Sequence, residues 1–273
     1  MVDFIFDGKK LSDFNMICCN FNSSNGTTEI SSGNDITFNR EHSSNSDFFH
    51  IYGKTYDQPF TLSLSICLNP CLGSMIMSVE QVSTIQKWLC RENKKFQIIK
   101  DGYENIFWMG VFICKQVMTD DDIIGLNITF TANSPYALKD ITPIELALTK
   151  DVSKDFIISS DIYGYIDADY TITVKEAGNL EISLYNGDVL DRTFIVANCT
   201  AGEVITITGQ TQIIQSSVAN HNLGKDSNFL FPRLVNTFSD YDDEVHNKLV
   251  SSLNCSIQIS YNPAIRIGYG YMG

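Results

Sequence analysis

The sequence predicts a mostly-β protein of two domains, the first combining strands with one helix and the second an antiparallel β-sandwich. The chain has 273 residues, more than the roughly 100 to 200 residues typical of one domain. Apolar residues make up 44% and charged residues 19% of the sequence, a composition that supports packed cores. Apolar and polar residues alternate in many short segments separated by Gly and Asn, which is the pattern of strands and turns.

Charge and hydropathy narrow the classes of function. The formal net charge is −13, and both halves of the chain are acidic. An acidic surface repels phosphate backbones and anionic lipids, which disfavours sequence readout of nucleic acid and peripheral membrane binding. No apolar run approaches the ~20 residues that span a bilayer, and the first ten residues lack the apolar core of a signal peptide. We therefore expect synthesis in a cytoplasm, with proteins or neutral sugars as partners.

The N-terminal segment predicts a short hairpin. Residues 4–6 are apolar, Asp7-Gly8 tolerates the positive φ angles of a tight turn, and the chain returns through residues 11–14. The polar stretch Asn20–Asn34 that follows is expected to be a loop. It is alternatively the tip of a long hairpin, because apolar residues alternate with polar ones from Ile36 onwards.

One helix is expected in the first domain. It follows a segment, residues 48–69, in which strand periodicity is clear. Ser78 and Gln81 have the spacing of a capping box, which marks a helix start. Apolar residues then recur every three or four positions until the basic segment 91–95, whose cations suit a helix C-terminus. The helix is therefore predicted over about 79–93.

Three further strands complete the first domain, at 96–99, 107–114 and 125–132. The pattern breaks near Asn133–Ala137, so the predicted domains are 1–137 and 138–273. The second domain alternates apolar and polar residues at roughly ten-residue spacing, which is typical of a sandwich. Its expected strands are Tyr170–Val174, Leu180–Leu184, Phe194–Val196, Val204–Ile207, Ile213–Ile214 and, as the last strand, Cys255–Tyr261.

Several local patterns in this order resemble the distal tail proteins, or Dit, of long-tailed, non-contractile bacteriophages. They are FIFDGKKLSDFNM at the N-terminus, MSVEQVSTIQKWLCRENKKFQI, FWMGVFI, FTANSPYAL and the closing SIQISYNPAIRIGY. Together they span nearly the whole chain, and their order and spacing carry the resemblance. The chain departs from the family at Phe14-Asn15, where Phe-Gly is frequent; Asn also tolerates positive φ. The segments Asn20–Asn34 and Asn39–Asp47 match no family feature and are candidate contact loops.

The resemblance implies a specific architecture and role. The first domain would be a split β-barrel with a helix that closes into a homohexameric ring, and the second a galectin-like sandwich facing outward. The ring would join the tail tube protein to the tail-tip or baseplate hub protein, with a receptor-binding protein or host glycan as a further partner. The protein would be a structural virion component at the tip of the tail, without membrane insertion or enzyme activity. The alternative is a carbohydrate-binding module presenting its sandwich to host-surface glycans.

Candidate catalytic residues are few. Asp167, Asp169, Glu181 and Asp191 are acidic residues of the second domain that could flank a sugar as a hydrolase pair. No GxSxG, P-loop or dinucleotide fingerprint is present. A sandwich hydrolase is therefore the least favoured function, and we assign no catalytic or cofactor-binding residue.

Candidate metal ligands are scattered. The four histidines, His42, His50, His221 and His246, have no partner at zinc-site spacing. Cys67 and Cys71 are four residues apart, but no second pair follows. Asp240, Asp242 and Glu244 alternate as in a calcium loop that lacks its glycine, and Asp120–Asp122 is expected to form a hairpin turn. No metal site is assigned, and the eight cysteines are expected to be buried, reduced thiols.

The aromatic residues divide between core and surface. Phe4, Phe6, Phe14, Trp88 and Leu89 are assigned to the first core, and Trp108 to a buried strand. For Tyr163, Tyr165, Tyr170 and Tyr185, packing in the core and an exposed sugar-stacking platform are equally favoured. If the first domain forms a ring, its open strand edges and the loop after Phe21 should carry the intersubunit contacts.

Overall fold

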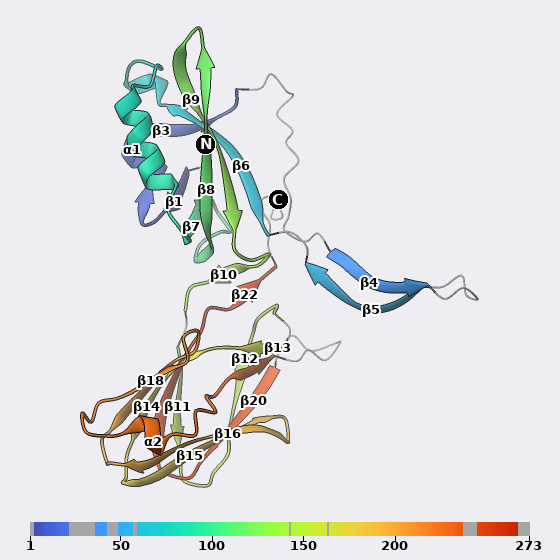
Figure 1. Ribbon diagram of the computed structural model, residues 1–273, viewed down its shortest axis with the longest axis vertical. Helices are drawn as coiled ribbons and strands as arrows, with labels where there is room; N and C mark the ends of the chain where they lie inside the picture. The colour runs from blue at the N-terminus through green and yellow to red at the C-terminus, as the bar shows by residue number, and fades with distance from the viewer. Residues whose placement is uncertain are drawn as a thin grey trace. The chain divides into compact units, whose positions relative to one another are not determined.

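The computed structural model describes residues 3–21, 36–42, 49–56, 59–141, 143–162, 164–236 and 245–266. It consists mainly of antiparallel strands, which confirms the predicted fold class. Two compact units are formed: unit 1 comprises residues 1–140 with 265–273, and unit 2 comprises residues 141–264. Figure 1 labels their elements. No helix within the described ranges has the length and apolar character needed to cross a bilayer.

A nine-stranded sheet forms the frame of unit 1. Its main path runs β2-β1-β7-β8-β9-β6-β3, and β10 joins both β8 and β22. The strands are β1 (Asp3–Phe6), β2 (Lys9–Lys10), β3 (Met16–Cys19), β6 (Thr61–Leu68), β7 (Lys94–Ile99), β8 (Ile106–Thr119), β9 (Asp122–Ala132), β10 (Ala137–Lys139) and β22 (Ala264–Ile265). The terminal strands β2 and β3 are not hydrogen-bonded to each other, so this barrel is split.

The N-terminal hairpin forms as predicted but is shorter on its second side. Asp7 and Gly8 adopt φ angles of 49° and 76° and join β1 to β2. After β2 the chain enters a 3₁₀-helix, η1 (Leu11–Phe14), instead of continuing as a strand. Asn15 ends η1 at φ 57°, a left-handed conformation that Asn tolerates better than most residues.

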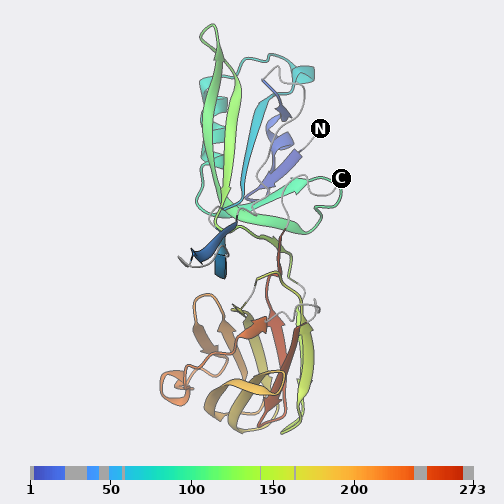
Figure 2. The same cartoon turned by 90° about the vertical axis from the view of Figure 1, so that its right-hand side faces the viewer.

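The helix α1 (Val79–Leu89) lies on one face of the sheet of unit 1 (Figure 1 and Figure 2). Its predicted start is confirmed, because Ser78 and Gln81 make both hydrogen bonds of a capping box. Its predicted end near residue 93 is wrong. Lys94 begins β7, which pairs with β1 and β8, and these strand hydrogen bonds replace a fourth helical turn.

An aromatic cluster fills the space between α1 and the sheet. Phe4, Phe6 and Leu89 are fully buried and Trp88 is 3% exposed, which confirms their assignment to the core. The other large members are Phe60, Phe96, Trp108, Phe112 and Phe130. Phe14 differs from the prediction: it stacks on Trp88 at 4.4 Å between ring centroids but is only partly buried, because η1 places it at the edge of the cluster.

A separate ribbon of unit 1 consists of β4 (Ile36–His42) and β5 (Phe49–Tyr56), which pair only with each other. The strand alternation from Ile36 onwards therefore reflects a hairpin with β5. The alternative that Asn20–Asn34 is the tip of a long hairpin is wrong, because the strand before it, β3, pairs with β6 and the strand after it, β4, pairs with β5. The expectation of a contact loop over Asn39–Asp47 is wrong for its first part, because Asn39–His42 belongs to β4. Residues 22–35 and 43–48, which hold the remainder of both predicted loops, lie outside the described residues.

Unit 2 is a two-layer sandwich. One layer is a five-stranded sheet ordered β11-β21-β14-β17-β18, and the other is a four-stranded sheet ordered β12-β20-β15-β16. The strands are β11 (Ile144–Leu148), β12 (Lys154–Ile158), β14 (Asp169–Val174), β15 (Gly178–Asn186), β16 (Val189–Cys199), β17 (Val204–Thr208), β18 (Ile213–Ser216), β20 (Val245–Ser251) and β21 (Cys255–Ser260). Every second residue of these strands faces a shared apolar core. The short strands β13 (Gly164–Ile166) and β19 (Leu234–Asn236) pair separately, and α2 (Leu223–Asp226) is a single turn.

One more strand, β22, follows the last strand of the sandwich. The prediction that Cys255–Tyr261 is the last strand is wrong, because β22 follows it and pairs with β10. Ile265 belongs to unit 1 and packs against the core of that unit. Unit 1 is therefore built from both ends of the chain.

Candidate assembly surface

Large apolar side chains are exposed in the connection between β6 and α1. Leu72 is 65% exposed, Met75 56%, Ile76 48% and Val79 77%. They lie within eight consecutive residues that run from the last residue of the 3₁₀-helix η2 (Pro70–Leu72) to the first residue of α1. Single exposed apolar residues are common on proteins, but a local concentration of this kind marks an interaction surface. We call these four residues the apolar stretch.

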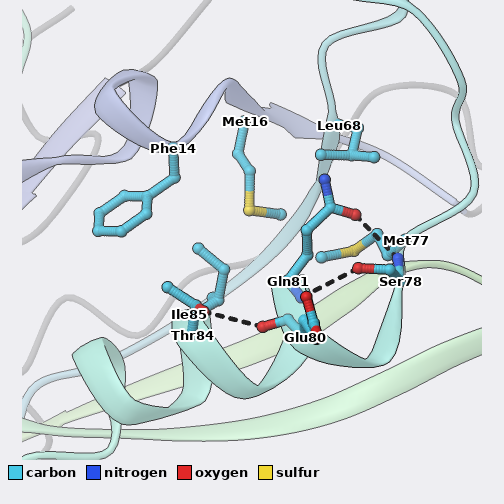
Figure 3. A pocket seen from close by; sticks show the side chains of 9 residues that line it. All are labelled: Phe14, Met16, Leu68, Met77, Ser78, Glu80, Gln81, Thr84 and Ile85. Carbon is cyan, nitrogen blue, oxygen red and sulfur yellow. Dashed lines mark hydrogen bonds between the residues drawn. The ribbon is translucent and has the colours of Figure 1, made fainter.

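A groove of about 450 Å³ lies beside the apolar stretch. Figure 3 shows the side chains that line it, which come from η1, β3, β6, the two residues before α1 and the first two turns of α1. The apolar members are Phe14, Met16, Leu68, Met77 and Ile85, and the polar members are Ser78, Glu80, Gln81 and Thr84. The groove thus combines apolar area with hydrogen-bonding groups, the composition of a protein contact surface.

Local hydrogen bonds hold this surface in place. Gln81 donates its backbone N–H to Ser78 Oγ at 3.2 Å, and Ser78 donates its own to Gln81 Oε1 at 2.8 Å (Figure 3). Met77 is tied to β9 by a backbone hydrogen bond to Ile123 at 2.7 Å. The groove also borders β3, the end strand of the sheet, for which β6 is the one partner strand within the described part of the chain. Open strand edges are sites at which another chain can add a strand.

Two of the four nominated carboxylates of unit 2 make structural contacts. Asp169 accepts a hydrogen bond from the backbone N–H of Gly209 at 2.8 Å. Asp191 binds Arg233 through both carboxylate oxygens, at 2.9 and 3.1 Å. The Arg233 hydrogen bonds hold the pKa of Asp191 below its ordinary value despite partial burial, which does not suit a general acid. Glu181 is exposed on β15, and Asp167 precedes β14.

The most buried ionic group of unit 2 was not predicted from the sequence. Glu203 is 1% exposed, and its carboxylate lies 2.5 Å from Nδ1 of His221. Ser216 donates to the same carboxylate, as does the backbone N–H of Thr200. Burial raises the pKa of Glu203, but these hydrogen bonds outweigh it and the net pKa is lowered. The Glu203 carboxylate is therefore held by hydrogen bonds from within unit 2.

The other predicted ligands are dispersed. His246 is exposed on β20, and the side chains of His42 and His50 lie outside the described residues, as do Asp240, Asp242 and Glu244. Among the described residues, no group of three or more His, Cys, Asp or Glu side chains is arranged to hold a metal ion.

The expectation that all cysteines are buried is wrong for Cys71 and Cys90, which are exposed. Cys71 lies in the short 3₁₀-helix η2, and Cys90 is the C-cap residue that follows α1.

The tyrosines considered for a sugar-stacking platform differ in exposure. Tyr165 is 53% exposed, whereas Tyr170 is buried and Tyr185 is partly buried, so these three do not form one exposed platform. Tyr163 lies outside the described residues.

Asp120 and Asp121 adopt φ angles of 49° and 70° in the turn between β8 and β9, which confirms the predicted hairpin turn.

Two family models match the sequence and together cover nearly all of it. Residues 1–134 match a phage tail protein N-terminal domain. Residues 136–261 match a phage tail C-terminal domain. The chain belongs to the phage tail proteins. Among curated proteins, none matches the sequence of this tail protein.

Solved structures agree with the family. The crystal structure of Dit from phage SPP1, described as a paradigm of the hub adsorption apparatus in phages infecting Gram-positive bacteria, has a TM-score of 0.64 to this chain. Sequence identity is 10%, over 96% of this chain and 99% of SPP1 Dit. The phage P2 baseplate in its activated conformation with Ca has a TM-score of 0.46 at 11% identity, over 95% and 98% of the two chains. The likeness to SPP1 Dit shows that the tail protein has the Dit fold.

The sequence contained a signal for the assembly surface of the tail protein. The segment CLGSMIM places four large apolar residues between a strand and a helix cap, where a solvated turn would be polar. Three of these residues, Leu72, Met75 and Ile76, are exposed and Met77 is buried. The pattern alone does not separate them, because a buried turn would have the same composition. The groove itself joins segments more than fifty residues apart and has no local signature.

Proposed function

We propose that this tail protein is a distal tail protein whose unit 1 assembles into a homohexameric ring at the tip of the virion. The ring would link the tail tube protein to the tail-tip or baseplate hub protein, with unit 2 available to a receptor-binding protein. Synthesis would take place in the cytoplasm of the bacterial host. The observation that carries the proposal is the apolar stretch beside the groove at the open edge of the sheet.

Closure into a ring would bury the apolar stretch and the edge of β3, which are exposed in a monomer. A ring applies the same heterologous contact at every interface, so an apolar surface on one subunit is covered by a different surface of the next. The edge of β3 and the apolar stretch would be buried together on that contact. The Dit fold of the chain supports this assignment.

The β4–β5 ribbon supports the same proposal independently. Its strands pair with no strand of the nine-stranded sheet. A two-stranded hairpin is at best marginally stable in water without a packing surface. A neighbouring subunit would supply such a surface, as exchanged hairpins do in other symmetric assemblies.

Light scattering coupled to size-exclusion chromatography tests the ring. We expect the wild-type chain to elute at six times its monomer mass and Leu72→Glu or Val79→Glu to shift the population to monomers. Val79 is the first residue of α1, where a carboxylate suits the helix dipole, so this change should not unfold the helix. Negative-stain images of the wild type should show rings with a central hole.

Ile157→Glu is the matched control, because Ile157 is 46% exposed but lies on β12 of unit 2. It should leave the oligomer intact. A wild-type chain that stays monomeric at high concentration, or a control that dissociates the oligomer as strongly as Leu72→Glu, would count against the proposal.

Glycan binding by unit 2 is the second candidate. A groove of about 500 Å³ lies over β11, β14 and β21, and its lining includes Glu145, Thr171, Thr173 and Gln258. Carboxylate, hydroxyl and amide groups are the partners that sugar hydroxyls use. A glycan array with the wild type and Gln258→Ala would test this, and the absence of any binding to host-wall glycans would remove it.

A further inference from the structure

Two thiols of unit 1 lie in contact although they are distant in sequence. The Sγ atoms of Cys90 and Cys114 are 3.7 Å apart. Cys90 follows directly on α1 and is exposed, whereas Cys114 lies on β8 and is partly buried. A disulfide has an S–S distance of about 2.05 Å, so the sulfurs need to approach by only about 1.7 Å. Rotation about the Cα–Cβ bonds supplies displacements of this size.

The surroundings hold the two thiols together. Next to Cys90, Arg91 donates to the carbonyl oxygen of Lys87 at 3.2 Å and to Asp7 at 2.7 Å, which ties the end of α1 to the β1–β2 turn. Cys114 is fixed within the β8–β9 ladder, where it pairs with Ile128. Cys90 has left the helical conformation, with φ −84° and ψ 49°, and is the more adjustable partner.

We propose that Cys90 and Cys114 are an oxidisable pair that forms a disulfide between the end of α1 and β8. The oxidant is a small disulfide of the glutathione type. The thiolate of Cys90 attacks one oxidant sulfur and releases a thiolate, which leaves a mixed disulfide on Cys90. Cys114 then attacks the Cys90 sulfur, its proton passes to solvent, and the second small thiolate leaves. Two protein thiols are oxidised and one oxidant disulfide is reduced to two thiols.

The two cysteines differ in their access to the oxidant. Burial, and then the proximity of Cys90, raises the pKa of Cys114 to about 12, so this thiol is neutral in ordinary buffers and is not the first nucleophile. Cys90 is exposed and meets the oxidant first. Formation of the mixed disulfide on Cys90 brings an electrophilic sulfur next to Cys114, which makes the second step intramolecular.

The bond would form after the protein leaves a reducing compartment. Cytoplasmic thiols are kept reduced, and disulfides persist in extracellular media. This timing rests on the proposed role as a virion component, whereas the chemistry of the pair does not. The bond would close a loop between residues 90 and 114, which includes β7, and would thereby restrain unit 1 in the released particle.

Peptide mapping of the full-length protein tests the inference. Purified reduced protein is incubated with oxidised glutathione, blocked with iodoacetamide and digested with trypsin without reduction. We expect a disulfide that joins peptides 88–91 and 101–115, the tryptic products that carry Cys90 and Cys114. We also expect the melting temperature of unit 1 to rise by roughly 5 to 10 °C, because the cross-link restricts the unfolded chain.

Two variants make the result specific. Cys90→Ser should abolish both the joined peptides and the rise in melting temperature, while its melting temperature in reducing buffer should match the wild type. Cys71→Ser, which removes the other exposed thiol, should change neither result. Persistence of the mixed disulfide on Cys90 with Cys114 still reduced would overturn the inference, as would a cross-link between two chains. Because the test uses no assembly readout, a failure of the ring proposal would not affect it.

Discussion

At the scale of single residues, the two tryptophans of unit 1 lie in one core but differ in the hydrogen bonding of their indole N–H groups. Trp88 donates its Nε1–H to the carbonyl oxygen of Phe6 at 2.8 Å. Trp108 is fully buried, and its Nε1 has no hydrogen-bond partner among the described residues. A buried donor without a partner carries the full cost of its desolvation. Both indole rings are therefore buried, but only the N–H of Trp88 has a hydrogen-bond partner among the described residues.

This contrast predicts different responses to the same substitution. Both Trp88→Phe and Trp108→Phe remove ring volume, but only Trp88→Phe also leaves the buried Phe6 carbonyl without its donor. Urea denaturation should show that Trp88→Phe lowers the free energy of unfolding by about 1–3 kcal/mol more than Trp108→Phe. Equal losses would mean that the indole hydrogen bond contributes no net stability.

Residue-level predictions succeeded where local pattern decides burial. Phe4, Phe6, Trp88 and Leu89 were assigned to the core from strand alternation and helical spacing, and they are buried. The exposure of Cys90 could not be obtained in this way. The buried apolar residues Trp88 and Leu89 precede it, but the chain leaves the helix at Cys90, and that exit depends on strand pairing elsewhere.

At the scale of elements, one buried cluster joins the two layers of unit 2 at their edge. Glu203 precedes β17, and Ser216, which donates to it, belongs to β18. His221 contacts Glu203 through Nδ1, and its Nε2 lies 2.9 Å from the carbonyl oxygen of Ala197 on β16. Both ring nitrogens of His221 thus face oxygen atoms of other residues. Asp226 of α2 adds a second carboxylate 3.7 Å from Nε2.

The cluster predicts an acid-sensitive contribution to stability. Because the folded-state pKa of Glu203 lies below its ordinary value of 4.5, the stabilisation is complete above that pH and is lost as the pH falls through the folded-state pKa. Glu203→Gln should lower the free energy of unfolding by about 1–3 kcal/mol near neutral pH. The difference between wild type and variant should shrink below about pH 4.5.

Chemical denaturation at a series of pH values measures this difference. Glu181→Gln is the control, since Glu181 is exposed on β15. A difference between wild type and Glu203→Gln that stays constant from neutral pH to well below 4.5 would contradict the assignment.

Element boundaries were predictable only where the signal is local. The start of α1 depends on Ser78 and Gln81 alone, and both capping bonds are present. The end of α1 is set by the pairing of Lys94–Ile99 with β1, a segment about ninety residues away in sequence. Helix propensity and the basic residues of 91–95 favour a helix to about residue 93, but the hydrogen bonds of β7 with its neighbouring strands replace the last helical turn.

At the scale of the whole molecule, both chain ends contribute to unit 1. The N-terminal strand β1 lies within the main sheet, and β22 extends it through β10. Sequence patterns located the strands of both units but not this return, because β22 is two residues long and carries no periodicity. The assembly surface is likewise a product of tertiary structure. The sequence thus determined the class of the fold, while its closure and its contact surfaces depended on pairing between distant segments.

The return of the chain predicts a selective loss of protection in unit 1. Ile265 packs against the core of unit 1, and β22 is one of the two strands that pair with β10 (Ala137–Lys139), the other being β8. Ile265→Asp places a charge at this partly buried position, which should cost about 1–3 kcal/mol. Hydrogen exchange should accelerate at the amides of β10, while β14 and β21 in the sandwich keep their protection. Ile213→Asp, at a position 52% exposed in unit 2, should leave β10 unchanged. If Ile265→Asp exchanges at β10 like the wild type, the contact of Ile265 does not stabilise unit 1.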